Sequence, residues 1–264
     1  MFNPESPFLL AVIAGLFGSI FGSFANVIIA RLVQGQSVVH PRSHCPNCKH
    51  TLNWNHLIPI FSWFLLAGKC AFCKTKISAR YPLVEILMAY LFGLTAYHYG
   101  ISVTSLEYMI FIFGLVTASF IDIDHYLLPD KITLPGIVIG ILGAAINPQR
   151  EFLDSILGVL FGGGALWLVA YLYQALRKQE GLGGGDIKLI AWIGALLGWQ
   201  AIPFVVMTGS IVGTVFGLAL SLGSKDGLKT VIPFGPYLAL GALLYIFGGS
   251  ELGALYLSLF FPQP

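Results

Sequence analysis

Four cysteines stand in two C-x2-C pairs, Cys45-Pro46-Asn47-Cys48 and Cys70-Ala71-Phe72-Cys73, with 21 residues between the pairs. They are all the cysteines of the chain. Two such pairs supply four thiolates, which can surround one tetrahedral Zn²⁺. The alternative is free or disulfide-bonded cysteines, and disulfides require an oxidising compartment. We therefore predict a structural zinc site whose ligands are Cys45, Cys48, Cys70 and Cys73.

Two acidic clusters lie where apolar segments end or begin, one from Phe120 to Asp130 and the other from Glu180 to Lys188. Ionised carboxylates at a lipid boundary are costly and usually face a cavity. Two neighbouring carboxylates share a proton, so one accepts while the other donates. Such a pair can activate water against a peptide carbonyl and protonate the leaving group, without a Ser or Cys nucleophile. We predict that Asp122 and Asp186 form this catalytic pair.

Each cluster also has a purely structural interpretation. Asp186 is suited to cap the N-terminus of a helix, and Asp122 and Asp124 are also consistent with ordinary boundary acids. The glycines Gly183 to Gly185 would let a substrate strand approach the backbone, or would serve linkage or close helix packing. A nucleotide-binding loop is disfavoured, because no strand precedes the glycines and no GKS or GKT follows.

The composition is that of a polytopic membrane protein. Hydrophobic residues make up 56% of the chain and charged residues 10%, whereas soluble domains carry about 25% charged residues. The 31 glycines suit close helix packing in lipid. The first apolar segment has no basic n-region, so it is expected to be a retained helix rather than a cleaved signal. Eight spans are predicted, at about 8–30, 82–99, 104–123, 132–147, 154–176, 187–200, 203–222 and 235–261. The sixth is short, and is expected to be broken or half-buried beside a water-accessible cavity.

The loop from Arg31 to Tyr81 holds seven basic residues and no acidic one. If this loop is cytoplasmic, alternation over eight spans places thirteen of the fourteen basic residues inside and only Arg150 outside. The N-terminus is then external, and the cysteines lie in a reducing cytosol that favours metal over disulfide. A topology signal or a contact with anionic lipid would explain the charges but not the paired cysteines. We expect Trp54, Trp63 and Phe72 to pack inside this loop.

The fold class that follows is an all-α polytopic membrane protein of about eight transmembrane helices, with a small cytoplasmic zinc-binding domain between the first and second. The predicted domains are the first transmembrane helix (1–30), the zinc-binding domain (31–81) and a transmembrane peptidase domain (82–264). Five acids outside the two clusters are expected to be solvated at external loops or ends: Glu5, Glu107, Glu151, Asp154 and Glu251.

Five motifs in order make the chain resemble the type IV prepilin peptidases. The stretch Gly22–Leu32 is similar to the family's GSF-x-NV…RL box, although Ala30 and Val33 stand where an aromatic residue and a proline are usual. The segment from Pro41 to Glu85 resembles its cytoplasmic zinc domain. The remaining three motifs are D-x6-P at Asp122 and Pro129, G-x-G-D at Gly183–Asp186, and a late box at Ile232–Leu238.

The resemblance implies a bacterial inner-membrane enzyme that cuts the basic leader from prepilins or pseudopilins on the cytoplasmic side. It then methylates the new N-terminal residue, commonly phenylalanine, with S-adenosylmethionine. Asp122 and Asp186 would be the water-activating pair, whereas no methyl-donor site and no role for Asp124 or Lys188 can be assigned. The lipid bilayer is an expected partner and nucleic acid is not. The basic loop does not attract a basic leader, so recognition is expected to rest on shape and on the pilin helix.

Two other functions remain open at this point. A secondary transporter would use border acids as a proton relay, and it predicts midplane carboxylates and repeats, neither of which is visible in the sequence. A zinc-anchored methyltransferase would lack protease activity. Replacing Asp122 or Asp186 by Asn separates both functions from a peptidase.

Overall fold

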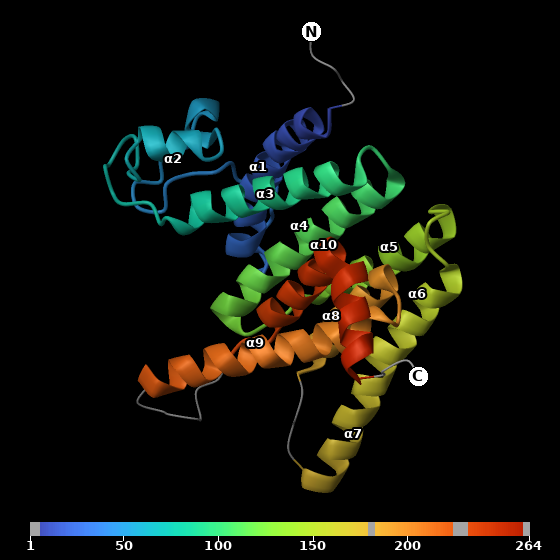
Figure 1. Ribbon diagram of the computed structural model, residues 1–264. Coiled ribbons are helices and arrows are strands. Elements are labelled where there is room, and N and C mark those ends of the chain that lie inside the picture. Colours follow the sequence, from blue (N-terminus) through green and yellow to red (C-terminus); the bar gives the residue numbers. More distant parts are fainter. Residues whose placement is uncertain (1–5, 179–182, 224–231, 261–264) are drawn as a thin grey trace. The chain divides into compact units, whose positions relative to one another are not determined.

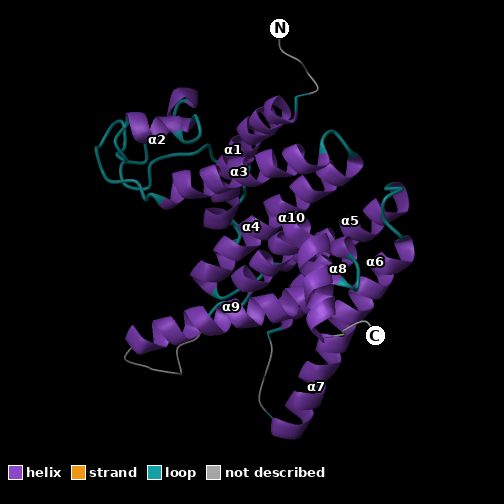
Figure 2. Ribbon diagram, viewed as in Figure 1, coloured by secondary structure: helices purple, strands orange, loops and turns teal. Residues whose placement is uncertain are grey.

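A computed structural model describes residues 6–178, 183–223 and 232–260 of the chain. Within these ranges the chain is helices and loops, with no β-strand beyond two isolated bridges, His44–Thr51 and Lys69–Lys76 (Figure 2). The helices are α1 (Pro7–Arg31), α2 (Phe61–Leu65), α3 (Arg80–Tyr99), α4 (Val103–His125), α5 (Asp130–Ile146), α6 (Phe152–Val159), α7 (Ala165–Arg177), α8 (Gly184–Leu197), α9 (Ala201–Gly223) and α10 (Gly235–Phe260). A 3-10 turn, η1 (Trp54–Leu57), precedes α2, and a π-helical turn, η2 (Leu160–Gly164), joins α6 to α7. The predicted all-α class is confirmed.

Among the described residues, four helical segments are long and apolar enough to cross a membrane: Pro7–Arg31, Val103–His125, Phe152–Arg177 and Ala201–Leu222. A shorter apolar helix covers Gly235–Gly249. Helices also occupy the other predicted segments, but crossing by those helices stays a prediction, as does the orientation of the chain.

The chain divides into two compact units, residues 1–113 and 114–264, so the boundary falls within α4. The domain limits predicted from the sequence stay predictions. Each unit is described by itself.

In the first unit α1 and α3 lie side by side (Figure 1). Glycines line the face of α1 that meets α3. A Cβ on Gly18 would stand 2.5 Å from the Met88 carbonyl oxygen, and one on Gly22 would stand 2.6 Å from the Cα of Glu85. Because residues this small let two helix backbones approach, the glycines of α1 account for the tight pairing.

In the second unit α8 is the central helix. Eight consecutive residues, Leu189 to Leu196, are buried, so neighbours enclose the helix on all sides. Trp192 fills the space above Gly136 of α5, and Gly194 meets Gly158 of α6 backbone to backbone. With 14 residues α8 is about 21 Å long, less than the hydrocarbon thickness of a bilayer. The prediction of a short helix is confirmed, but the alternative of a broken helix was wrong, because α8 is continuous between Gly183 and Gly198.

Two expectations about individual side chains were wrong. Glu107 is buried, with 8% of its surface exposed, because it shares an inward face of α4 with Thr104 and Phe111. Trp54 is 76% exposed and does not pack inside the cysteine-bearing loop. Trp63 does pack there, against Gly68, and its indole N–H donates to the Ile77 carbonyl oxygen at 3.2 Å.

Candidate functional site

Asp122 lies in the last turn of α4, with 5% of its surface exposed. The backbone N–H of Gly235, the first residue of α10, donates to Asp122 Oδ2 at 3.0 Å. A Cβ at position 235 would stand 2.7 Å from the same oxygen, so only glycine allows this approach without a shift. Asp122 is therefore a buried carboxylate held by a backbone donor 113 residues away, not a boundary acid in solvent.

Asp186 is the third residue of α8 and is half-buried. The capping alternative was wrong, because Gly183 occupies the cap position and the cap makes no side-chain hydrogen bond. One carboxylate oxygen of Asp186 instead lies over Gly183, 3.2 Å from where a Cβ would stand. The glycines therefore keep the backbone in front of this carboxylate bare. Glu180, at the start of the same predicted cluster, lies outside the described residues.

The side chain of Leu128 contacts a glycine beside each of the two acids. Its buried side chain meets Gly185, next to Asp186, and also Gly235, which binds Asp122. Cβ atoms at those glycines would both stand 3.0 Å from the leucine side chain. Asp122 and Asp186 therefore lie around the same leucine, one through its hydrogen bond to Gly235 and the other through its neighbour Gly185. The structure thus brings together the ends of α4, α8 and α10 around the predicted pair.

Two carboxylates so placed can divide acid and base roles between them. Like charges in a partly desolvated place do not both ionise easily, so the pair tends to hold one shared proton. The ionised member can then accept a proton from water while the protonated member donates one to a leaving group.

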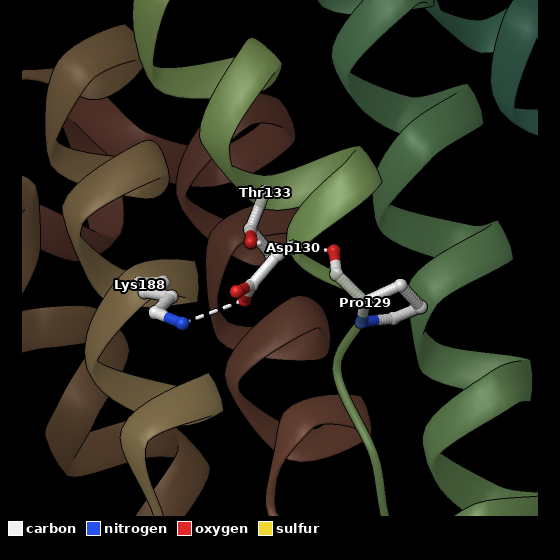
Figure 3. Close-up of polar contacts among 4 residues, drawn as sticks. All are labelled: Pro129, Asp130, Thr133 and Lys188. Atoms are coloured by element: carbon white, nitrogen blue, oxygen red, sulfur yellow. Dashed lines mark hydrogen bonds and ion pairs between the residues drawn. The ribbon is translucent and has the colours of Figure 1, made fainter. Parts of the chain in front are cut away.

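Beside this pair, an ion pair joins the N-terminal ends of α5 and α8. Lys188 Nζ lies 2.6 Å from Asp130 Oδ1, and the two side chains point at one another from neighbouring helices (Figure 3). The Thr133 hydroxyl donates to the Pro129 carbonyl oxygen at 3.3 Å and closes the first turn of α5. Lys188, which the sequence left without a role, is thus a contact between two helices that flank the acids.

The four cysteines form a second site, in the first unit. All four are free, and their Sγ atoms lie within 4.8 Å of one another. Tetrahedral zinc with Zn–S bonds of about 2.3 Å places its sulfurs about 3.8 Å apart. Because Cys45 Sγ and Cys73 Sγ are 3.7 Å apart, the cluster fits a metal ion of this kind.

The two pairs are built alike, which explains why they converge. The N–H of Cys45 donates to the His50 carbonyl oxygen at 3.0 Å, and the N–H of Cys70 donates to that of Thr75 at 2.9 Å. Lys49 and Lys74 hold matching left-handed conformations, with φ of 59° and 58°. Hydrogen bonds with the side chain and backbone of Thr75 lower the pKa of Cys73 to about 5. The Asn47 amide also lies 3.7 Å from Cys73 Sγ and 2.9 Å from the Thr75 hydroxyl.

Sequence reasoning missed the role of Glu85, which is buried on α3. The Ile60 N–H donates to Glu85 Oε2 at 2.6 Å, and the Ser23 hydroxyl of α1 donates to the same carboxylate. Ile60 has φ of 66°, a conformation that is strained for a β-branched residue. Glu85 therefore ties α1 and the cysteine-bearing loop to α3. The signal that could have found it was an acid inside an apolar segment.

Comparisons with known proteins cover most of the chain. A model described as the bacterial peptidase A24 N-terminal domain matches residues 16–99, and one described as the type IV leader peptidase family matches residues 109–218. A prepilin leader peptidase/N-methyltransferase of Stutzerimonas stutzeri is 36% identical, over 97% of this chain and 96% of that protein. The protein of the same name from Pseudomonas aeruginosa is 34% identical, over 92% and 91%. Its namesake in Myxococcus xanthus is 38% identical, over 84% and 67%. No solved structure matches the chain.

Proposed function

Because the chain belongs to the type IV leader peptidase family, we propose that it removes the leader of type IV prepilins or pseudopilins and then methylates the new N-terminus. It is a membrane aspartic endopeptidase that also acts as an N-methyltransferase. Its relatives carry both activities in their name and match it nearly end to end.

In the proposed reaction, Asp122 and Asp186 are the catalytic residues. The ionised carboxylate of the pair accepts a proton from water, and the water oxygen attacks the scissile carbonyl carbon. The protonated carboxylate then donates to the amide nitrogen as the C–N bond breaks. The bare backbone at Gly183 to Gly185 lets the substrate strand reach the pair.

The observation that supports this proposal is that Leu128 contacts both Gly185, next to Asp186, and Gly235, which binds Asp122. A carboxylate held by the Gly235 N–H is oriented before substrate arrives. The methyltransferase-only hypothesis does not call for an oriented pair of acids.

Zinc is the metal that we assign to Cys45, Cys48, Cys70 and Cys73, since four thiolates in a closed tetrahedron are typical of structural zinc. The metal would stabilise a loop of about 50 residues that has little core of its own. The methyl donor is S-adenosylmethionine, and the described residues give no location for it.

We place the protein in the bacterial inner membrane, with the N-terminus periplasmic and the cysteine-bearing loop cytoplasmic, from the distribution of basic residues. A prepilin enters lipid by its apolar helix and keeps its basic leader in the cytosol. Its cleavage point then lies at the same membrane border as the two acids.

The test uses the full-length protein in membranes or detergent with a prepilin substrate. Asp122→Asn and Asp186→Asn should each slow cleavage by about 10²–10⁴-fold or more, because each removes one half of a proton transfer. Methylation of a pilin that is already cleaved should continue in both variants. Asp124→Asn is the matched control, since Asp124 lies exposed on the same helix as Asp122. Cleavage at the wild-type rate in both single variants would exclude the pair as catalytic.

A further inference from the structure

A cavity of about 400 Å³ lies in the second unit, between α9 and the first turn of α10. Ser210, Gly213, Thr214 and Gly217 of α9 form one wall, and Phe234 and Tyr237 line the other. Among the described residues that line the cavity none is acidic. Its volume is in the range of pockets that hold a ligand group.

The two walls of the cavity are in contact at the glycines of α9. A Cβ at Gly217 would stand 2.5 Å from Ile232 Cδ1, and one at Gly213 would stand 3.1 Å from Tyr237 Cδ2. The cavity therefore belongs to the packing of α9 against the segment that begins at Ile232.

Adjacent residues of one helical turn line the cavity and bind Asp122. Phe234 lines the cavity, and the next residue, Gly235, donates its N–H to Asp122. The hydrogen bonds from Tyr237 N–H and Leu238 N–H to the Phe234 carbonyl oxygen close this turn. A helical turn is about 10 Å across, and an extended chain advances about 3.3 Å per residue. A substrate strand that passes Asp122 thus reaches the cavity within about three residues.

We propose that this cavity is a specificity pocket that takes an apolar side chain from the first residues of the mature pilin, on the carboxyl side of the cleaved bond. The proposal rests on the proposed function and names the substrate element that the site reads. A basic leader gains nothing from a lining without acids, whereas an apolar side chain gains by leaving water. The pocket also lies on α9, one of the helices apolar enough to cross the membrane, where the pilin helix would lie.

The test combines a substitution that fills the pocket with substitutions that shorten side chains of the substrate. Thr214→Phe places a ring inside the cavity, and Val215→Phe, at the next position of α9, is the control because Val215 is exposed and does not line it. Each protein is assayed for kcat/KM on a prepilin and on variants in which one of the three residues after the cleavage point is replaced by Ala. Loss of fit in an apolar pocket changes kcat/KM by about 10–200-fold.

We expect Thr214→Phe to lower kcat/KM on the unchanged prepilin by at least about tenfold, and Val215→Phe to leave it near the wild-type value. At one of the three positions, Ala should lower the wild-type rate but not the Thr214→Phe rate, since the two changes act on the same contact. If both changes add at every position, or if the two Phe variants behave alike, the pocket assignment is wrong while the peptidase activity stands. If the wild-type protein cleaves no prepilin, the proposed function itself fails.

Discussion

Gly235→Ala should slow prepilin cleavage, because the one methyl group that it adds would crowd Asp122. The new methyl group would stand 2.7 Å from Asp122 Oδ2 and 3.0 Å from Leu128, whereas ordinary contact begins at 3.4 Å. The carboxylate oxygen or the helix end must therefore shift by about 0.7 Å, which lengthens the 3.0 Å bond from the Gly235 N–H. A hydrogen bond to a charged group contributes about 1.5–3 kcal/mol, so its loss corresponds to about 10–150-fold in rate.

The assay measures kcat/KM for prepilin cleavage in parallel with methylation of a pilin that is already cleaved. Cleavage should fall by the stated factor, while methylation should hold, because methyl transfer needs no water-activating pair. Gly249→Ala is the matched control on the same helix, since its methyl group meets Tyr245 at an ordinary 3.6 Å. If Gly235→Ala cleaves as fast as Gly249→Ala, the N–H of residue 235 does not orient Asp122 for catalysis.

Three further predictions concern the scaffold. Gly22→Ala should destabilise the protein by about 1–3 kcal/mol, because its methyl group would meet the α3 backbone; thermal unfolding measures this against Gly164→Ala, which has nothing within 4 Å. Cys70→Ser should reduce bound zinc from about one ion per chain to near none and make the loop cleavable by added protease; unchanged zinc content would exclude Cys70 as a ligand. Lys188→Ala should change stability by less than about 1 kcal/mol, since Lys188 and Asp130 are 39% and 55% exposed; a larger loss in denaturant unfolding would contradict this.

The helices were predictable because an apolar run is a local property of the chain. Each predicted segment is helical where the structure describes it, since chain length, glycine and proline positions set the ends. The cysteine cluster was equally predictable from the sequence. The spacing within each C-x2-C pair is typical of a metal-binding turn, and two such pairs supply the four thiols of one site. Spacing could not predict that Lys49 and Lys74 adopt matching left-handed conformations, because no sequence rule assigns that conformation to lysine.

The features that the sequence did not predict depend on contacts between distant segments. No residue pattern around Asp122 predicts its hydrogen bond from the Gly235 N–H, or the contacts of Leu128 with Gly185 and Gly235. The burial of Glu107 and the exposure of Trp54 were missed for the same reason, since each is decided by the element that does or does not cover the side chain. The position of a residue along one segment predicts whether its side chain is buried only when the neighbouring element is known.

The donor to Asp122 comes from α10, the last helix of the chain. Because α4 ends at His125 and α10 begins at Gly235, Asp122 is synthesised well before its donor. Until α10 is in place, Asp122 lacks the donor that the Gly235 N–H supplies. Any change that displaces the start of α10 would therefore disturb Asp122 from outside its own helix.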